Sequence, residues 1–311
     1  MKGGFSFHVN LDIAPNEANN FDSVGTFSII QSATIYNPKI DDFERRALIS
    51  GNMLRHFLYE WFSRLIQENE EKWYLSEEAV NFSGYRYKKS KVKYYETANK
   101  TSEIELVKNK KLNPDSIKVL RDADVFGFMV TTGTTVRRSS VVYVSDLVGG
   151  KISTAIMSRN QVGIVAKSKN GDNEGAAEQQ RITYEQASGI YTGGMRFFLG
   201  GIGRIEDTNE FVLDEAEQKL RIKYLLDAIE SVYGHGNFGA RRARKDIYIK
   251  NGEAIAVAVK GANFLPGYAR NLEEAKELKA SIEKLLPTAE VEIFHGTPIK
   301  VVEELRKFYG I

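Results

Sequence analysis

The order of the strongly patterned segments restricts the fold of this chain more than any other feature of its sequence. Residues 5–11 alternate apolar and polar side chains, which predicts a half-buried strand. The apolar periodicity over residues 50–67, with Ser50 at the N-cap position, predicts an amphipathic helix. Residues 214–234 predict a second long helix, whose expected inward face comprises Ala216, Leu220, Tyr224, Leu225 and Ala228.

Strands are predicted between and after these two helices. Residues 125–132 and 137–148 indicate two strands on either side of a turn, and residues 244–260 indicate a strand or a hairpin around Asn251 and Gly252. The tail predicts a helix, a strand and a helix over about 271–286, 291–294 and 298–308. The order of the core segments is that of a βαββαβ unit, so we expect an α+β, ferredoxin-like or RNA-recognition fold with large insertions.

Three segments interrupt this core order. Residues 14–25 are rich in Asn, Pro and Gly and predict a loop. Residues 68–116 are rich in Lys and Tyr and lack sustained apolar periodicity, which indicates an inserted subdomain. Residues 158–186 predict two strand-like arms around a polar, glycine-containing tip, which is typical of a projecting hairpin.

Composition excludes several classes of function. The 43 basic and 41 acidic side chains give a formal charge of +2, so an anion site must come from local clustering. The absence of cysteine removes thiol chemistry and disulfides, and the four histidines show no metal-ligand spacing. We therefore expect no cofactor and no metal. No apolar run reaches the roughly 20 residues of a membrane span, so a cytoplasmic location is expected.

The stretch "RDADVFGFMVTTGTTVRRSS", residues 121–140, allows more than one interpretation. Asp122 and Asp124 could bind a divalent metal if further carboxylates converged on them, but we interpret them as acceptors that organise the turn before a strand. Phe126 and Phe128 partly match an RNA-stacking motif, although no basic residue precedes them. On one face of a strand they would form a base platform if exposed, and we interpret them as core.

Basic clusters are the stronger candidates for binding nucleic acid. Glycine lets backbone amides approach a phosphate closely and arginine binds phosphate oxygens bidentately, which makes the glycine and arginine segment 234–245 the densest candidate site. A looser patch over residues 85–93 fits a solvated hairpin face. The basic candidates are Arg137 and Arg138 at a strand start, Arg159, Lys167 and Lys169 on the hairpin, and Arg241, Arg242 and Arg244 in the glycine and arginine segment. No GxSxG, HExxH, Walker or Rossmann motif is present.

Several of these pieces together resemble a known family. The N-terminal strand, the Asn-rich loop, "ISGNMLRHFL", "DADVFGF" and "GNFGARRAR" follow one another as in the CRISPR-associated backbone subunits of type I Cascade complexes, and the DevR-like group is the most similar. The resemblance spans nearly the whole chain. It implies an RNA-recognition-like palm over residues 1–67 and 117–311, an inserted finger subdomain over 68–116 and a thumb hairpin over 157–184.

The resemblance also implies a function. Copies of such a subunit line up along a guide (cr)RNA and hold its backbone without cutting it, within a complex that contains other subunits and meets target DNA. Ser50, Gly51, Asn52 and Arg55 match the helix-start segment that faces the guide backbone. Such binding needs scattered phosphate contacts rather than base readers, which agrees with the modest net charge.

Two other functions stay open at the level of sequence. A guide-directed RNA endonuclease of the same superfamily would use an aspartate on a loop, and Asp12 and Asp22 flank the Asn-rich loop. A regulator that binds duplex DNA is suggested only by the DevR label, and no helix-turn-helix pattern supports it.

Overall fold

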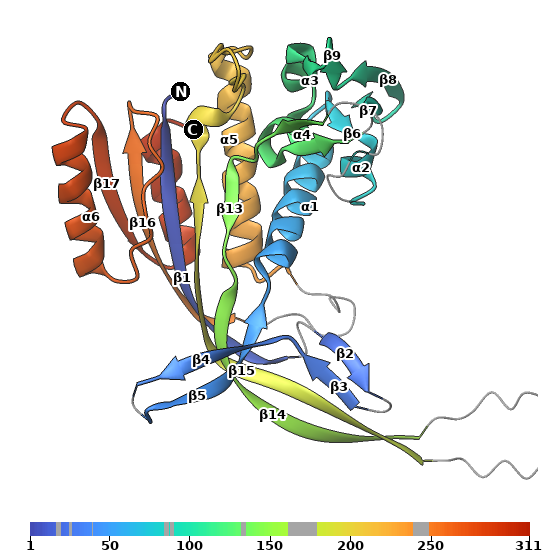
Figure 1. Cartoon of the computed structure of the whole chain (residues 1–311), viewed down its shortest axis with the longest axis vertical. Coiled ribbons are helices and arrows are strands. Elements are labelled where there is room, and N and C mark those ends of the chain that lie inside the picture. Colours follow the sequence, from blue (N-terminus) through green and yellow to red (C-terminus); the bar gives the residue numbers. More distant parts are fainter. Residues whose placement is uncertain are drawn as a thin grey trace, which may run out of the picture.

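A large, mostly antiparallel sheet runs the length of the molecule and carries helices on both faces (Figure 1). The computed structural model describes residues 1–16, 20–24, 27–38, 40–83, 87, 90–131, 135–160, 179–238 and 249–311. Its helices are α1 (Gly51–Asn69), α2 (Glu77–Val80), α3 (Pro114–Val119), α4 (Arg121–Phe126), α5 (Glu215–Ile229), α6 (Leu272–Leu285) and α7 (Pro298–Tyr309), and a π-helical turn, Glu230–Gly234, continues α5.

Within these residues, ten strands form the large sheet and seven more form small sheets. The ten are β1 (Gly3–Asn16), β2 (Asn20–Val24), β3 (Phe27–Ile30), β4 (Ser32–Asn37), β5 (Asp42–Ile49), β13 (Val142–Val144), β14 (Leu147–Asn160), β15 (Gln179–Phe197), β16 (Ile249–Lys260) and β17 (Glu290–Gly296). The seven are β6 (Leu75–Ser76), β7 (Lys91–Thr97), β8 (Lys100–Glu105), β9 (Val107–Lys108), β10 (Lys111–Leu112), β11 (Phe128–Val130) and β12 (Val136–Arg138). The order of the large sheet is β17-β16-β1-β15-β14-β5-β4, and β13 also pairs with β15.

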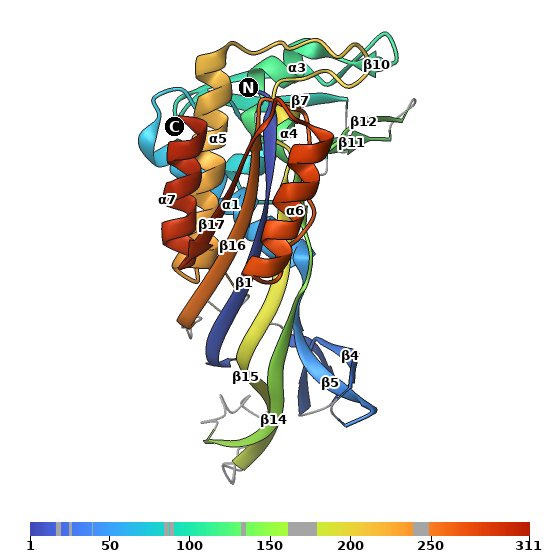
Figure 2. The same ribbon diagram turned by 90° about the vertical axis from the view of Figure 1, so that its left-hand side faces the viewer.

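The first face of the central strands packs against α1, α5 and α7, as the side view shows (Figure 2). Strand β1 sends Phe5, Phe7 and Val9 into this core, which confirms the predicted alternation. Helix α1 begins where the sequence predicts, because the Ser50 side chain accepts a hydrogen bond from the Met53 amide at 3.3 Å.

Strand β16 is buried on both faces, which explains its unbroken apolar sequence "AIAVAV". Ala254, Ala256 and Ala258 belong to the core under α1 and α5, whereas Ile255 and Val257 face α6 on the other side of the sheet (Figure 2). The strand runs straight through Asn251 and Gly252, so the hairpin alternative for this segment is wrong. The predicted helix, strand and helix of the tail are confirmed as α6, β17 and α7.

The buried face of α5 agrees with its predicted face at Tyr224, Leu225 and Ala228 and differs from it at other positions. Ala216 is exposed and Leu220 only half-buried, while Ile222, Leu226 and the charged Arg221 are buried. A pattern read from apolar residues alone could not place a fully buried arginine on the inward face. The reason for its burial is a set of ion pairs around Asp124.

Asp124 lies at the centre of this buried network. Its carboxylate accepts hydrogen bonds from Arg221 Nη1 at 2.8 Å, from the Gly203 amide at 2.9 Å and from Arg138 Nη2. Arg221 also bonds to Glu217 at 2.9 Å. Burial alone would raise the pKa of Glu217, but its arginine partners lower it below the ordinary value. The arginines of the network therefore favour the ionised form of the Glu217 carboxyl.

Residues 121–126 form helix α4 and not the start of a strand, so the predicted strand over 125–132 is wrong in its first half. Gly127, with φ of +69°, turns the chain from α4 into β11. Phe126 and Phe128 are buried in two different cores, which confirms that they pack inside the protein but excludes a shared face. Asp122 accepts from the Ser76 amide at 3.0 Å and the Tyr87 hydroxyl at 3.0 Å, and burial raises its pKa.

The second hydrophobic core lies at the end of the molecule that carries α3, α4 and β7 (Figure 1). It combines residues from the 68–116 segment, such as Val92 and Leu106, with Ile117, Leu120 and Ile205 from outside it. The inserted segment is therefore not self-contained. In the described residues no helix is long and apolar enough to cross a membrane, and no group of three or more potential ligands could hold a metal.

The predicted hairpin is present as the long arms of β14 and β15, and its tip, residues 161–178, lies outside the described residues. Around the base of these arms, residues 20–49 form β2 to β5 (Figure 1), and β1 extends through Asn16. The predicted loop over 14–25 is thus largely strand. Its polar residues fit strands because β2 and β3 pair with one another and β3 pairs with β15.

We predict that Asp124→Ala lowers the free energy of unfolding by about 3–5 kcal/mol, because it leaves Arg138 and Arg221 buried without their anion. Urea denaturation measures the change. Asp207→Ala removes an exposed carboxylate from a nearby turn and should change stability by less than about 0.5 kcal/mol. Equal effects of the two substitutions would show that the network does not stabilise the fold.

Candidate nucleic-acid interface

The start of α1 is tied to the junction between β13 and β14. The Gly51 amide donates to Asp146 Oδ1 at 2.7 Å, and a Cβ on Gly51 would fall 2.5 Å from the Val144 carbonyl oxygen. Ser50 caps the helix through Met53. Two of the first-turn amides thus already have acceptors, and one acceptor is an anion placed at the positive end of the helix.

The four residues predicted to bind RNA at the helix start have different roles in the structure. Ser50 and Gly51 have local structural roles, and Asp146 competes with any phosphate for the helix end. Asn52 is exposed and stays available to a ligand. Arg55 is half-buried and donates one hydrogen bond to the Phe126 carbonyl, so its side chain lies against α4.

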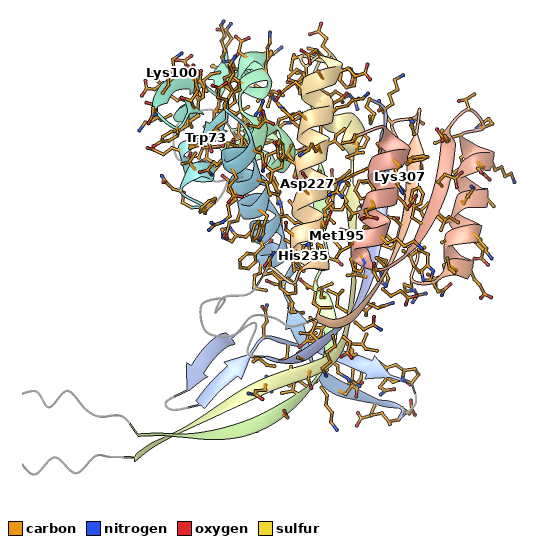
Figure 3. All side chains as sticks on the ribbon, turned by 180° about the vertical axis from the view of Figure 1, so that it is seen from behind. Trp73, Lys100, Met195, Asp227, His235 and Lys307 are labelled. Carbon is orange, nitrogen blue, oxygen red and sulfur yellow. The ribbon has the colours of Figure 1, made fainter. Side chains whose placement is uncertain are left out.

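The end of α5 lies at the same end of the molecule as the start of α1, because the two helices run in opposite directions (Figures 1 and 3). In Figure 3 His235 lies at this end of α5, beside α1. Trp61 Nε1 of α1 donates to the Asn237 carbonyl at 3.0 Å, and Phe238 is buried. Residues 234–238 are therefore anchored against α1, while Arg241, Arg242 and Arg244 lie outside the described residues.

Among the other predicted basic residues, Arg138 requires a correction. Its side chain is 2% exposed and bonds to Asp124 and to the carbonyls of Gly201 and Arg204, so it cannot reach a nucleic acid. Arg137, the next residue, is exposed on β12. Arg159 belongs to β14, but its side chain lies outside the described part, as do Lys167 and Lys169.

The second face of the central strands carries residues that the sequence patterns did not single out. Here β13, β15 and β1 place Tyr143, Arg196 and Ser6 side by side, and the next row contains Gly194 and His8. The ring of Tyr268, from the segment between β16 and α6, packs onto Gly194, where any Cβ would clash with it. Glycine at 194 therefore allows the ring to lie on the sheet.

Arg196 lies between two tyrosine rings on this face. Its guanidinium carbon is 5.3 Å from the centre of the Tyr268 ring and 6.0 Å from that of Tyr143. Its Nε is buried without a hydrogen-bond partner in the described structure. Both tyrosines are 40% exposed. We call Tyr143, Arg196 and Tyr268 the sheet-face patch.

Sequence patterns contained part of this signal. Tyr143 alternates with Val142 and Val144 in "VVYV", and Arg196 alternates with Met195 and Phe197, so both could have been assigned to the face opposite the core. In the view from behind, Met195 lies on the sheet beneath the helices (Figure 3). Strand alternation puts Arg196 on the other face. Tyr268 follows an irregular Pro-Gly segment, where no periodicity could place it.

A short chain of hydrogen bonds lies beside the patch. Thr192 Oγ1 donates to Asn10 Oδ1 at 2.7 Å and lies 3.1 Å from His8 Nε2, so the imidazole donates from Nε2 to the hydroxyl in this arrangement. Burial lowers the pKa of His8 below its ordinary value of 6.5. The imidazole is therefore neutral at pH 7.

Because the pKa of His8 is lowered in the folded state, we predict that stability falls as the pH decreases below about 6.5. The unfolded chain takes up a proton there that the folded protein resists, so acid favours unfolding. His8→Gln should reduce the loss of unfolding free energy between pH 7.5 and 5.5, measured by urea denaturation. Thr192→Val keeps the buried imidazole and should keep the pH dependence. An unchanged pH dependence in His8→Gln would contradict the assignment.

Comparisons with known proteins agree on one family. A family model described as "CRISPR-associated negative auto-regulator DevR/Csa2" matches residues 9–271. A relative from Methanocaldococcus jannaschii, described as "CRISPR-associated protein Cas7/Cst2/DevR", is 31% identical over 220 residues, which are 67% of this chain. The match spans 65% of that relative, slightly under two thirds of its length.

Two solved structures are similar at a TM-score of 0.46. One, a "CRISPR RNA-guided surveillance complex, pre-nicking", is 12% identical and the match covers 92% of this chain and 90% of the other. The second, a "CRISPR RNA-guided surveillance complex", is 9% identical, with 98% and 99% covered. These overlays are too loose to carry an argument about function.

Proposed function

The chain belongs to the CRISPR-associated DevR/Csa2 family, and we propose that it is a non-catalytic backbone subunit of a type I CRISPR surveillance complex. In this proposal it binds guide (cr)RNA through the phosphate backbone, and several copies assemble along one RNA. Together with the other subunits of the complex, they present the guide to target DNA in the cytoplasm.

One observation carries the proposal: three segments with candidate RNA-binding residues begin at the same end of the helix pair. Helix α1 starts there, and Asp146 at the base of the β14–β15 arm is bonded to its first residue. The segment that leads to the arginines at 241, 242 and 244 is anchored to α1 through Trp61. A phosphate strand at this end would be within reach of Asn52 and would lie near the points where the described parts of the other two segments begin.

In this proposal each part of the fold has its own role. Strands β16, β1, β15 and β13 lie side by side with α1 and α5 on one face, which is the arrangement expected for the palm of an RNA-recognition fold. In the proposal the palm comprises residues 1–67 and 117–311, the arm over 157–184 serves as the thumb, and residues 68–116 serve as the finger. The second core supports a finger fixed to the palm, since it contains residues of both.

The chemistry of these residues suits an RNA held without reading its sequence. Arginine and lysine neutralise phosphates whatever the base, and each copy needs only a few such contacts. A net charge of +2 is compatible with this, because local clustering of basic residues is enough for a few phosphate contacts. Specificity then comes from pairing between guide and target, not from the protein.

We predict that replacing Arg241, Arg242 and Arg244 by alanine weakens RNA binding and makes it less salt-dependent. Losing up to three contacts to a single strand should reduce the slope of log K against log salt by about 2. Fluorescence anisotropy with a labelled single-stranded RNA between about 50 and 200 mM salt, over which the Debye length falls roughly two-fold, measures it. The matched control replaces Lys276, Lys284 and Lys307, three exposed lysines of α6 and α7, by alanine.

The control variant should bind RNA as the wild type does, although it loses the same charge. If the arginine variant also keeps its affinity and salt slope, the glycine and arginine segment does not bind the guide backbone. Equal losses in both variants would indicate binding by overall charge instead of a site.

For the non-catalytic part of the proposal, we predict no cleavage of RNA complementary to the bound guide when Mg²⁺ is added. Asp12 lies within strand β1, where it pairs with Ile190 and Asn251, and not on a loop. Gel analysis of labelled RNA is the measurement. Metal-dependent cleavage that Asp12→Asn or Asp22→Asn abolishes would establish the endonuclease alternative.

A further inference from the structure

We propose that the sheet-face patch, Tyr143, Arg196 and Tyr268, binds an unpaired nucleotide of single-stranded RNA. A base would stack on an exposed tyrosine ring, and the guanidinium would donate to a phosphate oxygen or a base edge. The proposal rests on the proposed function only in taking RNA as the ligand. The patch is separate from the helix start and from the glycine and arginine segment.

The state of Arg196 is the first argument. In the described structure no carboxylate lies within ion-pair distance of its guanidinium, and its buried Nε has no acceptor. Arg138 Nε also lacks an acceptor, but Arg138 and Arg221 are each paired with an anion, and within the described residues the absence of an anion distinguishes Arg196 from them. A buried donor without an acceptor carries a desolvation cost, which an anionic or polar ligand would remove.

The geometry of the patch is the second argument. Tyr143 lies directly opposite Arg196 in the pairing of β13 with β15, and Gly194 seats the Tyr268 ring on the sheet. The two rings hold the planar guanidinium between them before any ligand arrives. Binding would therefore cost little side-chain entropy.

The chemistry of the rings favours RNA over a carboxylate of a partner protein. An acidic side chain needs only the cation, whereas both tyrosines expose 40% of their surface around it. Exposed aromatic rings beside a cation on the face of an antiparallel sheet suit the stacking of unpaired bases. The neighbouring Thr192 is exposed and Asn10 half-buried, which adds polar groups for a ribose or base edge.

A short segment of the chain links the patch to the start of α1, which packs on the other face of the sheet. Ser145, two residues after Tyr143, exchanges hydrogen bonds with the backbone of Gly194 at 2.8–3.0 Å, and Asp146 bonds to the first residue of α1. The segment 143–146 therefore connects the sheet-face patch to the helix start. A strand bound at the helix end could continue along this segment to the tyrosines.

The test measures the affinity of variants for a labelled, U-rich single-stranded RNA by fluorescence anisotropy. Tyr143→Leu and Tyr268→Leu should each raise Kd about 5- to 100-fold, the range expected for loss of base stacking. Tyr143→Phe and Tyr268→Phe keep the ring and should restore affinity. Arg196→Gln should weaken binding as well. Tyr36→Leu removes an exposed tyrosine from the β4–β5 hairpin and should have no effect.

A second measurement uses the wild-type protein and therefore does not depend on whether the variants fold. RNA containing 5-iodouracil should cross-link on irradiation to Tyr143 or Tyr268 of the wild-type protein, located by mass spectrometry of the peptides. Cross-links confined to other segments, together with unchanged Kd in the leucine variants, would overturn the proposal. The proposal would also be overturned if the patch variants bound RNA normally but no longer bound a protein partner of the complex.

The outcomes separate this inference from the proposed function. If the variant lacking Arg241, Arg242 and Arg244 binds weakly while the patch variants bind normally, the sheet-face proposal fails and the backbone-binding role stands. If only the patch variants lose affinity, RNA binds on the sheet face and the glycine and arginine segment is not its site.

Discussion

The buried carboxylate of Asp124 connects segments of this protein that lie far apart in the chain. It connects α4 to β12 through Arg138, to α5 through Arg221 and to the turn at Gly203. These partners come from segments up to 97 residues apart in the chain. Since a buried charge without its partner is strongly destabilising, the network favours an arrangement of α4, β12 and α5 in which these partners meet. The surfaces available to RNA depend on that arrangement.

The long periodic elements of this fold were predictable from sequence. Both long helices, the N-terminal strand and the C-terminal helix, strand and helix lie where their patterns place them, because each buries one apolar face. The errors in α4 and α5 occur where polar residues are buried. Arg221 faces inward on α5, and Asp122 and Asp124 belong to a helix, because distant partners satisfy them. Local sequence contains no information about such partners.

The candidate site was predictable to a smaller extent. Basic character alone grouped Arg137 with Arg138, yet alternation in β12 exposes the first and buries the second. The motif that contains Phe126 and Phe128 suggested an aromatic platform, but both rings are core. Exposed rings lie instead at Tyr143 and Tyr268, which come together only because β13 pairs with β15 and Gly194 leaves room for a ring. Only the folded structure shows that these two rings lie close together.

The N-terminus of α1 differs from a free helix end in its capacity to bind an anion. A helix N-terminus attracts anions, and here the anion already present is Asp146. An RNA phosphate at this end would therefore depend on neighbouring side chains, such as Asn52 and the arginines beyond Phe238, more than on the helix dipole. Backbone binding in this proposal therefore relies on basic side chains, and base contacts rely on the face of the sheet.

The nucleic acid that accompanies the purified protein tests the central claim most directly. Native mass spectrometry of the complex isolated from cells gives the identity and length of the nucleic acid and the number of protein copies on it. The account predicts single-stranded RNA of defined length that carries several copies of the chain. Protein free of nucleic acid, or bound to duplex DNA, would contradict it.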